Sequence, residues 1–147
     1  AGALGMMQLM PATASEQMKK TKQYGLTIQQ SASLLNPDKN ITLGAVHLDN
    51  LIEEFEGNIV LISAAYNAGS GNVRKWLKLF GDPRQTGLSW IDWIELIPFN
   101  ETRNYIHRVL ETFIAYQQRF YQTKKAGHHS YDIFQALTTP LPIRDKL

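Results

Sequence analysis

At residues 59–69 the sequence reads Ile-Val-Leu-Ile-Ser-Ala-Ala-Tyr-Asn-Ala-Gly, an almost continuously apolar run that ends in a polar turn. The apolar part, Ile59 to Tyr66, is far shorter than the roughly 20 residues needed to cross a bilayer. It is long enough for a buried helix of about two turns. A helix without a polar face has to be covered by other parts of the chain, so this run predicts a helical core.

Amphipathic segments flank this run, and Gly and Pro residues separate them. Pro11 suits the first position of a helix that continues to Gln23. Gly25 then suits the left-handed conformation that follows a helix, and a second, short helix is predicted after Thr27. No stretch of useful length alternates between apolar and polar residues, so no strand is predicted.

Periodicity predicts four more helices, at residues 40–57, 73–80, 90–96 and 101–122. Asn40 and Asn100 are good N-caps for the first and the last of these. Asp82-Pro83 is predicted to open a polar loop. The apolar stripe after Asn40 is predicted to comprise Ile41, Ala45, Leu48, Leu51, Ile52 and Phe55. That of the longest helix is predicted to comprise Ile106, Val109, Leu110, Phe113 and Tyr116.

Length and composition limit the possible classes of protein. The chain has 147 residues, of which 44% are hydrophobic and 19% charged, and this fits one globular domain. A net charge of +2 gives no strong attraction to nucleic acid, so none is expected as a partner. Zero cysteines exclude disulfides and thiolate metal sites. The four histidines have no metal-site spacing, and no metal or cofactor is expected; they are His47, His107, His128 and His129.

Three clusters place polar or soft side chains beside permissive backbone. They are Gly5-Met6-Met7-Gln8-Leu9-Met10-Pro11, Ala64-Ala65-Tyr66-Asn67-Ala68-Gly69 and Ile97-Pro98-Phe99-Asn100-Glu101-Thr102-Arg103-Asn104-Tyr105. Each has a structural interpretation. Methionines fill gaps in a core, a buried Tyr can precede a helix stop, and a Glu in the first turn of a helix is favoured by the helix dipole.

Each cluster also has a functional interpretation. Thioethers beside the amide of Gln8 make a surface suited to sugars, which are both polar and apolar. Tyr66, at the end of a buried helix, can project a phenol into a cleft. Glu101 can line the same cleft as a carboxylate. The residues alone leave both interpretations open.

The order of the three clusters resembles that of the soluble lytic transglycosylases, relatives of goose-type lysozyme. Three shorter motifs strengthen the resemblance, which covers residues 1–121; they are Leu35-Asn36-Pro37, Asn40-Ile41 and Gly69-Ser70-Gly71-Asn72-Val73-Arg74. It implies an all-α, lysozyme-like domain of about six to eight short helices with a glycan groove. Residues 1–123 are expected to be this domain, and residues 124–147 a C-terminal extension.

The resemblance also implies a function, a compartment and roles for individual residues. The substrate would be the glycan strands of peptidoglycan, in the periplasm or cell envelope. Gln8, Met10 and Asn67 would bind the glycan, as would Tyr105. Glu101 and Tyr66 would support catalysis. Met6 departs from the Leu that is common in the family, a swap of similar volume that a core tolerates.

The resemblance places the catalytic acid in a Glu-Ser pair before the first cluster. The chain starts between the expected place of this Glu-Ser pair and the first cluster, and it starts without a leader. We therefore expect it to be part of a longer protein that carries this Glu. The acid would protonate the glycosidic oxygen and then, as a carboxylate, deprotonate the 6-hydroxyl of the muramyl residue, which closes a 1,6-anhydro ring. The chain alone is therefore expected to be inactive. The alternatives are a goose-type lysozyme-like hydrolase, a non-catalytic peptidoglycan-binding module and a helical interaction domain; the oligomeric state stays open.

Overall fold

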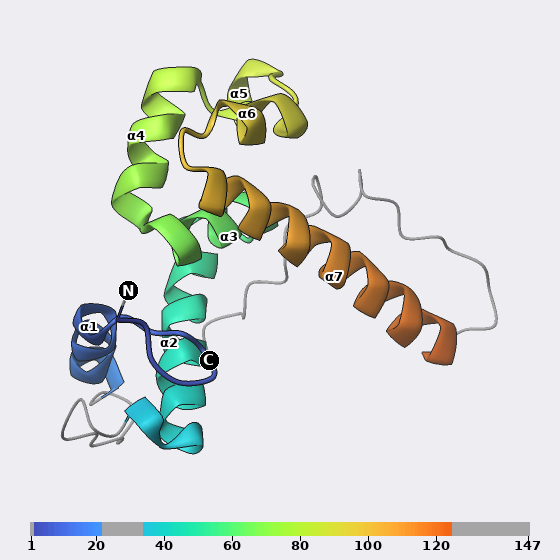
Figure 1. The fold of residues 1–147 in the computed structure, drawn as a ribbon. Helices are drawn as coiled ribbons and strands as arrows, with labels where there is room; N and C mark the ends of the chain where they lie inside the picture. The colour runs from blue at the N-terminus through green and yellow to red at the C-terminus, as the bar shows by residue number, and fades with distance from the viewer. Residues whose placement is uncertain (1, 22–33, 125–147) are drawn as a thin grey trace. The chain divides into compact units, whose positions relative to one another are not determined.

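The computed structural model describes residues 2–21 and 34–124 (Figure 1). This part of the chain is all α-helical, as predicted, and its only β pairing is an isolated bridge between Leu4 and Leu9. The helices are α1 (Pro11–Thr21), α2 (Pro37–Glu54), α3 (Ile59–Ala68), α4 (Ser70–Phe80), α5 (Pro83–Thr86), α6 (Trp90–Leu96) and α7 (Asn100–Lys124). The end of the first helix at Gly25, the helix after Thr27 and the extension beyond Lys124 lie outside the described residues.

The chain forms two compact units, residues 1–50 and residues 51–147, with the boundary inside α2. The first unit contains a tight loop, which the Leu4–Leu9 bridge closes and which leads into α1 at Pro11. Gln8 has a positive φ of 47° in this loop. The loop lies so close to α2 that a Cβ added to Gly5 would come within 2.3 Å of the Asn40 side chain.

Asn40 is not the N-cap that the sequence analysis predicts. It lies inside α2 and is fully buried, since the helix already begins at Pro37. Its side-chain oxygen accepts a hydrogen bond from the backbone N–H of Met7 at 2.7 Å, and its amide nitrogen donates one to the carbonyl of Leu4 at 3.0 Å. The prediction failed because the partners of this polar side chain lie more than 30 residues earlier in the sequence.

The predicted apolar stripe of α2 is right at its C-terminal end and wrong at its start. Leu51 and Phe55 are buried, but Ile41 and Ala45 are exposed. The buried positions in the first half of the helix are Asn40, Leu43 and Gly44. This face carries an amide and a glycine, so a search for apolar residues alone misplaced it. A Cβ on Gly44 would lie within 2.6 Å of the Met7 side chain, so only glycine leaves room for the loop.

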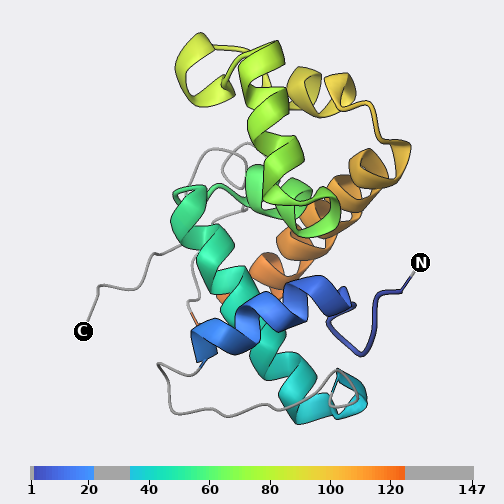
Figure 2. The same ribbon diagram turned by 90° about the vertical axis from the view of Figure 1, so that its left-hand side faces the viewer.

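The second unit is built around α3, which confirms the buried helix predicted from residues 59–66. The side chain of Asn58 caps α3, and the seven residues from Ile59 to Ala65 are all buried. α3 packs against both α4 and α7, and Figure 2 shows α3 beside α7 in a second view. The first half of α7 is buried on one side through Thr102, Ile106 and Leu110.

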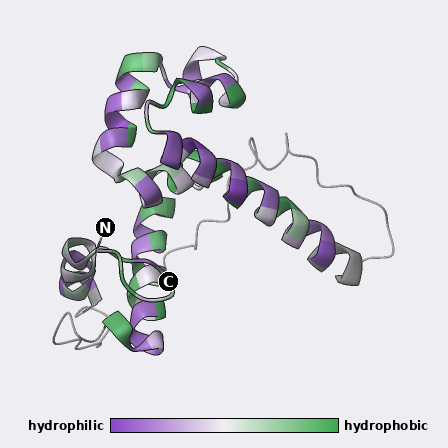
Figure 3. Ribbon diagram, viewed as in Figure 1, coloured by the Kyte–Doolittle hydropathy of each residue, from purple (hydrophilic) through white to green (hydrophobic). Residues whose placement is uncertain are grey.

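Two other predictions for the second unit need correction. Asp82-Pro83 opens a short helix, α5, because the Asp82 carboxylate caps it and Pro83 occupies its first turn. The neighbouring guanidinium of Arg84 donates hydrogen bonds to Asp82 and lowers the pKa of that carboxyl. On α7, hydrophobic and hydrophilic residues alternate around the helix (Figure 3). Tyr116 is 57% exposed, so it is not part of the buried stripe.

Candidate active site

The end of α3 places Tyr66 and Asn67 at the surface of the second unit. Both are half-buried, in contrast to the fully buried residues before them. Gly69 follows the last residue of α3, its φ of 85° is a conformation that favours glycine, and α4 begins at the next residue. The predicted break in the helix is therefore a single residue. It leaves the last turn of α3 open on one side.

The start of α7 meets this last turn through a partly buried hydrogen bond. Thr102 is 1% exposed, and its hydroxyl donates to the side-chain oxygen of Asn67 at 2.7 Å. Because the Asn67 oxygen accepts this bond, its amide nitrogen is available as a donor to a ligand. The bond joins two of the sequence clusters across 35 positions.

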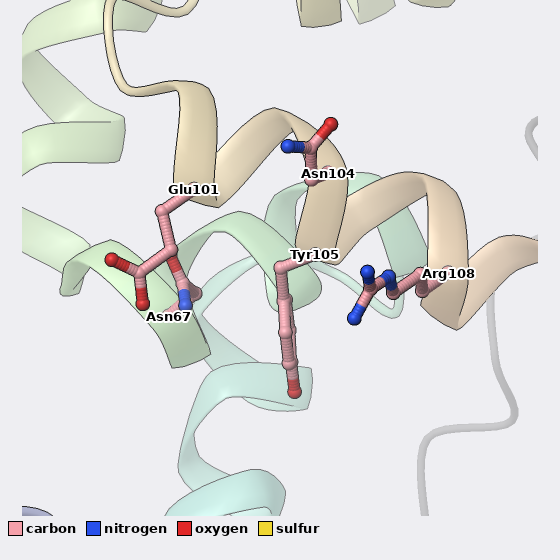
Figure 4. A pocket seen from close by; sticks show the side chains of 5 residues that line it. All are labelled: Asn67, Glu101, Asn104, Tyr105 and Arg108. Carbon is pink, nitrogen blue, oxygen red and sulfur yellow. The ribbon is translucent and has the colours of Figure 1, made fainter.

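A hollow of about 300 Å³ lies beside this bond. Its lining residues are Asn67, Glu101, Asn104, Tyr105 and Arg108. Figure 4 shows Glu101 and Tyr105 extending from the same side of α7, with the Tyr105 ring between Glu101 and the Arg108 guanidinium. The lining thus combines two amides, a phenol and two opposite charges with the apolar surface of one aromatic ring.

Arg103 holds the first turn of α7 in place. Its guanidinium donates to the carbonyl of Ile97 and to the side-chain oxygen of Asn100. Its Nε atom also lies 4.0 Å from the carboxylate of Glu95 in α6. The Nε2 atom of His107 lies 3.2 Å from the same carboxylate. These contacts tie α6 to α7, so the turn that carries Glu101 has a defined position.

Both tyrosines near the end of α3 and the start of α7 have raised pKa values. Burial and, to a smaller extent, the nearby Tyr105 together raise the pKa of Tyr66 to about 12, the latter because two tyrosinates would repel each other. Burial also raises the pKa of Tyr105. Both phenols are therefore neutral at physiological pH and can donate hydrogen bonds.

The structure brings together three of the six predicted site residues around the hollow: Asn67, Glu101 and Tyr105. Tyr66 does not line the hollow, although it is next to Asn67 in sequence and interacts with Tyr105. Gln8 and Met10 belong to the first unit, where both are exposed and the amide nitrogen of Gln8 donates to the carbonyl of Gly5 at 2.8 Å. Their roles in glycan binding stay predictions.

Sequence reasoning missed three residues of this site: Thr102, Asn104 and Arg108. The first two belong to the third cluster but were not singled out. All three could have been found from helical spacing. Positions 101, 104, 105 and 108 share one face of a helix, and position 102 starts the neighbouring buried face of positions 106 and 110. No group of three His, Asp or Glu side chains in residues 2–21 and 34–124 could hold a metal ion.

Comparison with known proteins assigns the family. The sequence matches the family described as "Transglycosylase SLT domain" over residues 1–87, which is more than half of the chain. The chain belongs to this family. This SLT domain is 39% identical over 119 residues to the soluble lytic murein transglycosylase of Escherichia coli K12, covering 81% of this chain and 17% of that protein.

Solved structures agree with the family assignment. A lytic transglycosylase Slt from Pseudomonas aeruginosa, solved as an inactive mutant, superposes with a TM-score of 0.67 and 47% identity, covering 80% of this chain and 18% of that one. A 70-kDa soluble lytic transglycosylase in complex with bulgecin A gives a TM-score of 0.72 and 33% identity, covering 95% and 21%. The SLT domain described here thus has the lysozyme-like helical fold of these enzymes. The chain spans less than a fifth of the length of the curated relative named above.

No helix in the described part of the chain combines the length and the apolar character that crossing a membrane requires.

Proposed function

We propose that this chain is the catalytic SLT domain of a peptidoglycan lytic transglycosylase. The reaction is cleavage of the β-1,4 bond between N-acetylmuramic acid and N-acetylglucosamine, which leaves 1,6-anhydromuramyl ends. The observation that supports this best is the hollow of about 300 Å³ where α3 and α7 meet, lined by Asn67, Glu101 and Tyr105. Family membership supplies the reaction class, and the hollow supplies a site of the right chemistry for a saccharide.

The neutral groups of the hollow bind the sugar. The amide nitrogen of Asn67 and the side-chain amide of Asn104 hydrogen-bond to hydroxyl or acetamido groups of the glycan. The Tyr105 ring offers an apolar surface, and its neutral hydroxyl adds a donor. Gln8 and Met10 of the first unit also contact the glycan strand in this proposal.

The general acid is a glutamate that precedes Ala1 in the parent protein. It protonates the glycosidic oxygen as the bond to the anomeric carbon breaks. As a carboxylate it then takes the proton of the muramyl 6-hydroxyl, whose oxygen bonds to the anomeric carbon. Replacement of one glutamate by glutamine in the inactive Pseudomonas relative is in keeping with this role. Glu101 and Tyr66 are supporting groups; the carboxylate of Glu101 favours the positive charge that develops at the anomeric carbon.

Residues 1–123 form the functional domain in this proposal, and residues 124–147 are an extension. The parent protein acts on peptidoglycan in the periplasm or at the cell envelope. Without the upstream glutamate, the 147-residue chain alone turns over about a hundredfold to ten-thousandfold more slowly than the parent.

Mass spectrometry of a peptidoglycan digest tests the reaction. We expect the parent protein to release muropeptides with anhydro ends, which are lighter by one water than hydrolysed ends. Hydrolysed ends would instead indicate a lysozyme-like reaction. Failure to release any muropeptide, together with failure to bind glycan, would overturn the proposed function.

A further inference from the structure

Arg108 is a cation of the hollow that the reaction does not use. It is exposed at the rim and forms no hydrogen bond or ion pair with any of the described residues. Three other arginines of the second unit differ in this respect. Arg74, Arg84 and Arg103 each pair with at least one carboxylate. Within residues 2–21 and 34–124, no side chain therefore competes with an outside anion for Arg108.

Glu101 does not neutralise Arg108, although both line the same hollow. They are seven residues apart on α7, which at about 1.5 Å per residue separates their backbones by about 10.5 Å. The Tyr105 ring lies between them in Figure 4. The hollow thus has a negative end, a neutral centre and a positive end, in the order of the helix.

We propose that Arg108 selects glycans that carry a carboxylate on the muramyl residue. This inference rests on the proposed function, because the neutral centre has to hold the sugar while Arg108 contacts its substituent. A planar guanidinium matches a carboxylate with two parallel hydrogen bonds. The carboxylate comes from one of two sources: the free lactyl group of a bare strand, or the peptide stem attached to that group.

The surroundings of Arg108 favour an isolated carboxylate over a polyanion. Glu101 lies two helical turns before Arg108 in the same hollow, and the exposed Glu111 lies one turn after it. A polymer with closely spaced negative charges would approach at least one of these carboxylates. A glycan strand carries its charges on separate substituents, so one can reach Arg108 without another meeting Glu101.

Binding of three oligosaccharides to the 147-residue chain tests this inference. The ligands are chitotetraose, which has no carboxylate; a peptide-free tetrasaccharide of alternating N-acetylglucosamine and N-acetylmuramic acid; and the same tetrasaccharide with its peptide stems. Isothermal titration calorimetry gives their affinities at low and high salt. We expect at least one carboxylate-bearing ligand to bind roughly tenfold more tightly than chitotetraose at low salt, in line with a charge-assisted hydrogen bond at an exposed site. The ligand that shows this preference identifies the source of the carboxylate.

Variants of Arg108 separate this role from general binding. Arg108→Gln should remove the preference and leave the affinity for chitotetraose unchanged, and Arg108→Lys should retain only part of it. Lys75→Gln is the matched control, because it removes one positive charge from the exposed surface of α4, away from the lining of the hollow. It should leave the preference intact.

The outcomes distinguish this inference from the proposed function. Equal affinity for all three ligands in the unaltered chain, or a preference that survives Arg108→Gln, overturns the role of Arg108 alone. Equal weakening of all three ligands by Arg108→Gln also overturns it, because the residue would then bind the sugar itself. Absence of binding by every ligand would overturn the proposed function as well.

Discussion

Replacing Thr102 with Val should both destabilise the domain and weaken glycan binding. Valine has nearly the shape of threonine, so the packing of this buried position is retained while the hydroxyl that donates to Asn67 at 2.7 Å is lost. Loss of a donor to a buried acceptor costs about 1–3 kcal/mol. Since Asn67 is half-buried and water can reach it, we expect the lower part of this range, about 1–2 kcal/mol. For a chain of this size that lowers Tm by about 3–6 °C.

Thermal unfolding followed by circular dichroism measures this change, and titration with chitotetraose measures binding. Without the Thr102 hydroxyl the Asn67 amide can rotate, so the affinity for chitotetraose should fall roughly threefold to tenfold. Thr102→Ser keeps the donor and should retain most of the affinity. Thr112→Val, on the exposed face of the same helix, is the matched control and should change neither quantity. If Thr102→Val behaves like Thr112→Val in both measurements, the hydrogen bond does not position Asn67.

Three further predictions concern the loop, the tyrosines and the carboxylate. Asn40→Ala should lower the free energy of unfolding, measured by chemical denaturation, by about 2–4 kcal/mol, because two backbone groups of the preceding loop lose their hydrogen-bond partner. A decrease in this free energy no larger than that caused by a substitution at an exposed position would contradict the prediction. Because the pKa of Tyr66 is raised to about 12 in the folded protein, its neutral phenol stabilises the fold fully below pH 10. This contribution to stability is lost as the pH rises from 10 through 12. Tyrosinate absorbance should therefore show a late-titrating tyrosine that Tyr66→Phe removes, and Tyr105→Phe should make Tyr66 titrate earlier. Glu101→Gln in the parent protein should reduce muropeptide release by less than the roughly hundredfold to ten-thousandfold expected for the general acid, and complete loss would reassign that role to Glu101.

The sequence predicted those helices that are marked by residues within the helix itself or that are buried on all sides. The apolar residues 59–66, the break at Gly69 and the periodicity of α4 and α6 each point to one structure, and all were confirmed. The buried face of α2 was misplaced because Asn40 and Gly44 are buried for their contacts with a distant loop. Hydrophobicity carries no signal of such contacts.

The candidate site was predictable to a similar extent. Motif order indicated Asn67, Glu101 and Tyr105, and the structure places them around one hollow. Helical spacing places Thr102 on the buried face of α7, but its partner Asn67 lies 35 positions away, so the sequence did not reveal the hydrogen bond between them. Arg108 lies outside the recognised motifs. Arg108 reaches the hollow because α7 continues beyond the motif and places position 108 on the same helix face as Glu101 and Tyr105.

Chemical-shift mapping of the 147-residue chain with chitotetraose tests the glycan site most directly. We expect the largest shift changes at the backbone amides of Asn67, Glu101 and Asn104, with smaller changes at the exposed α4 residues Lys75 and Lys78. Unchanged spectra at millimolar ligand, or changes confined to residues away from the end of α3 and the start of α7, would contradict the assignment of this hollow to peptidoglycan.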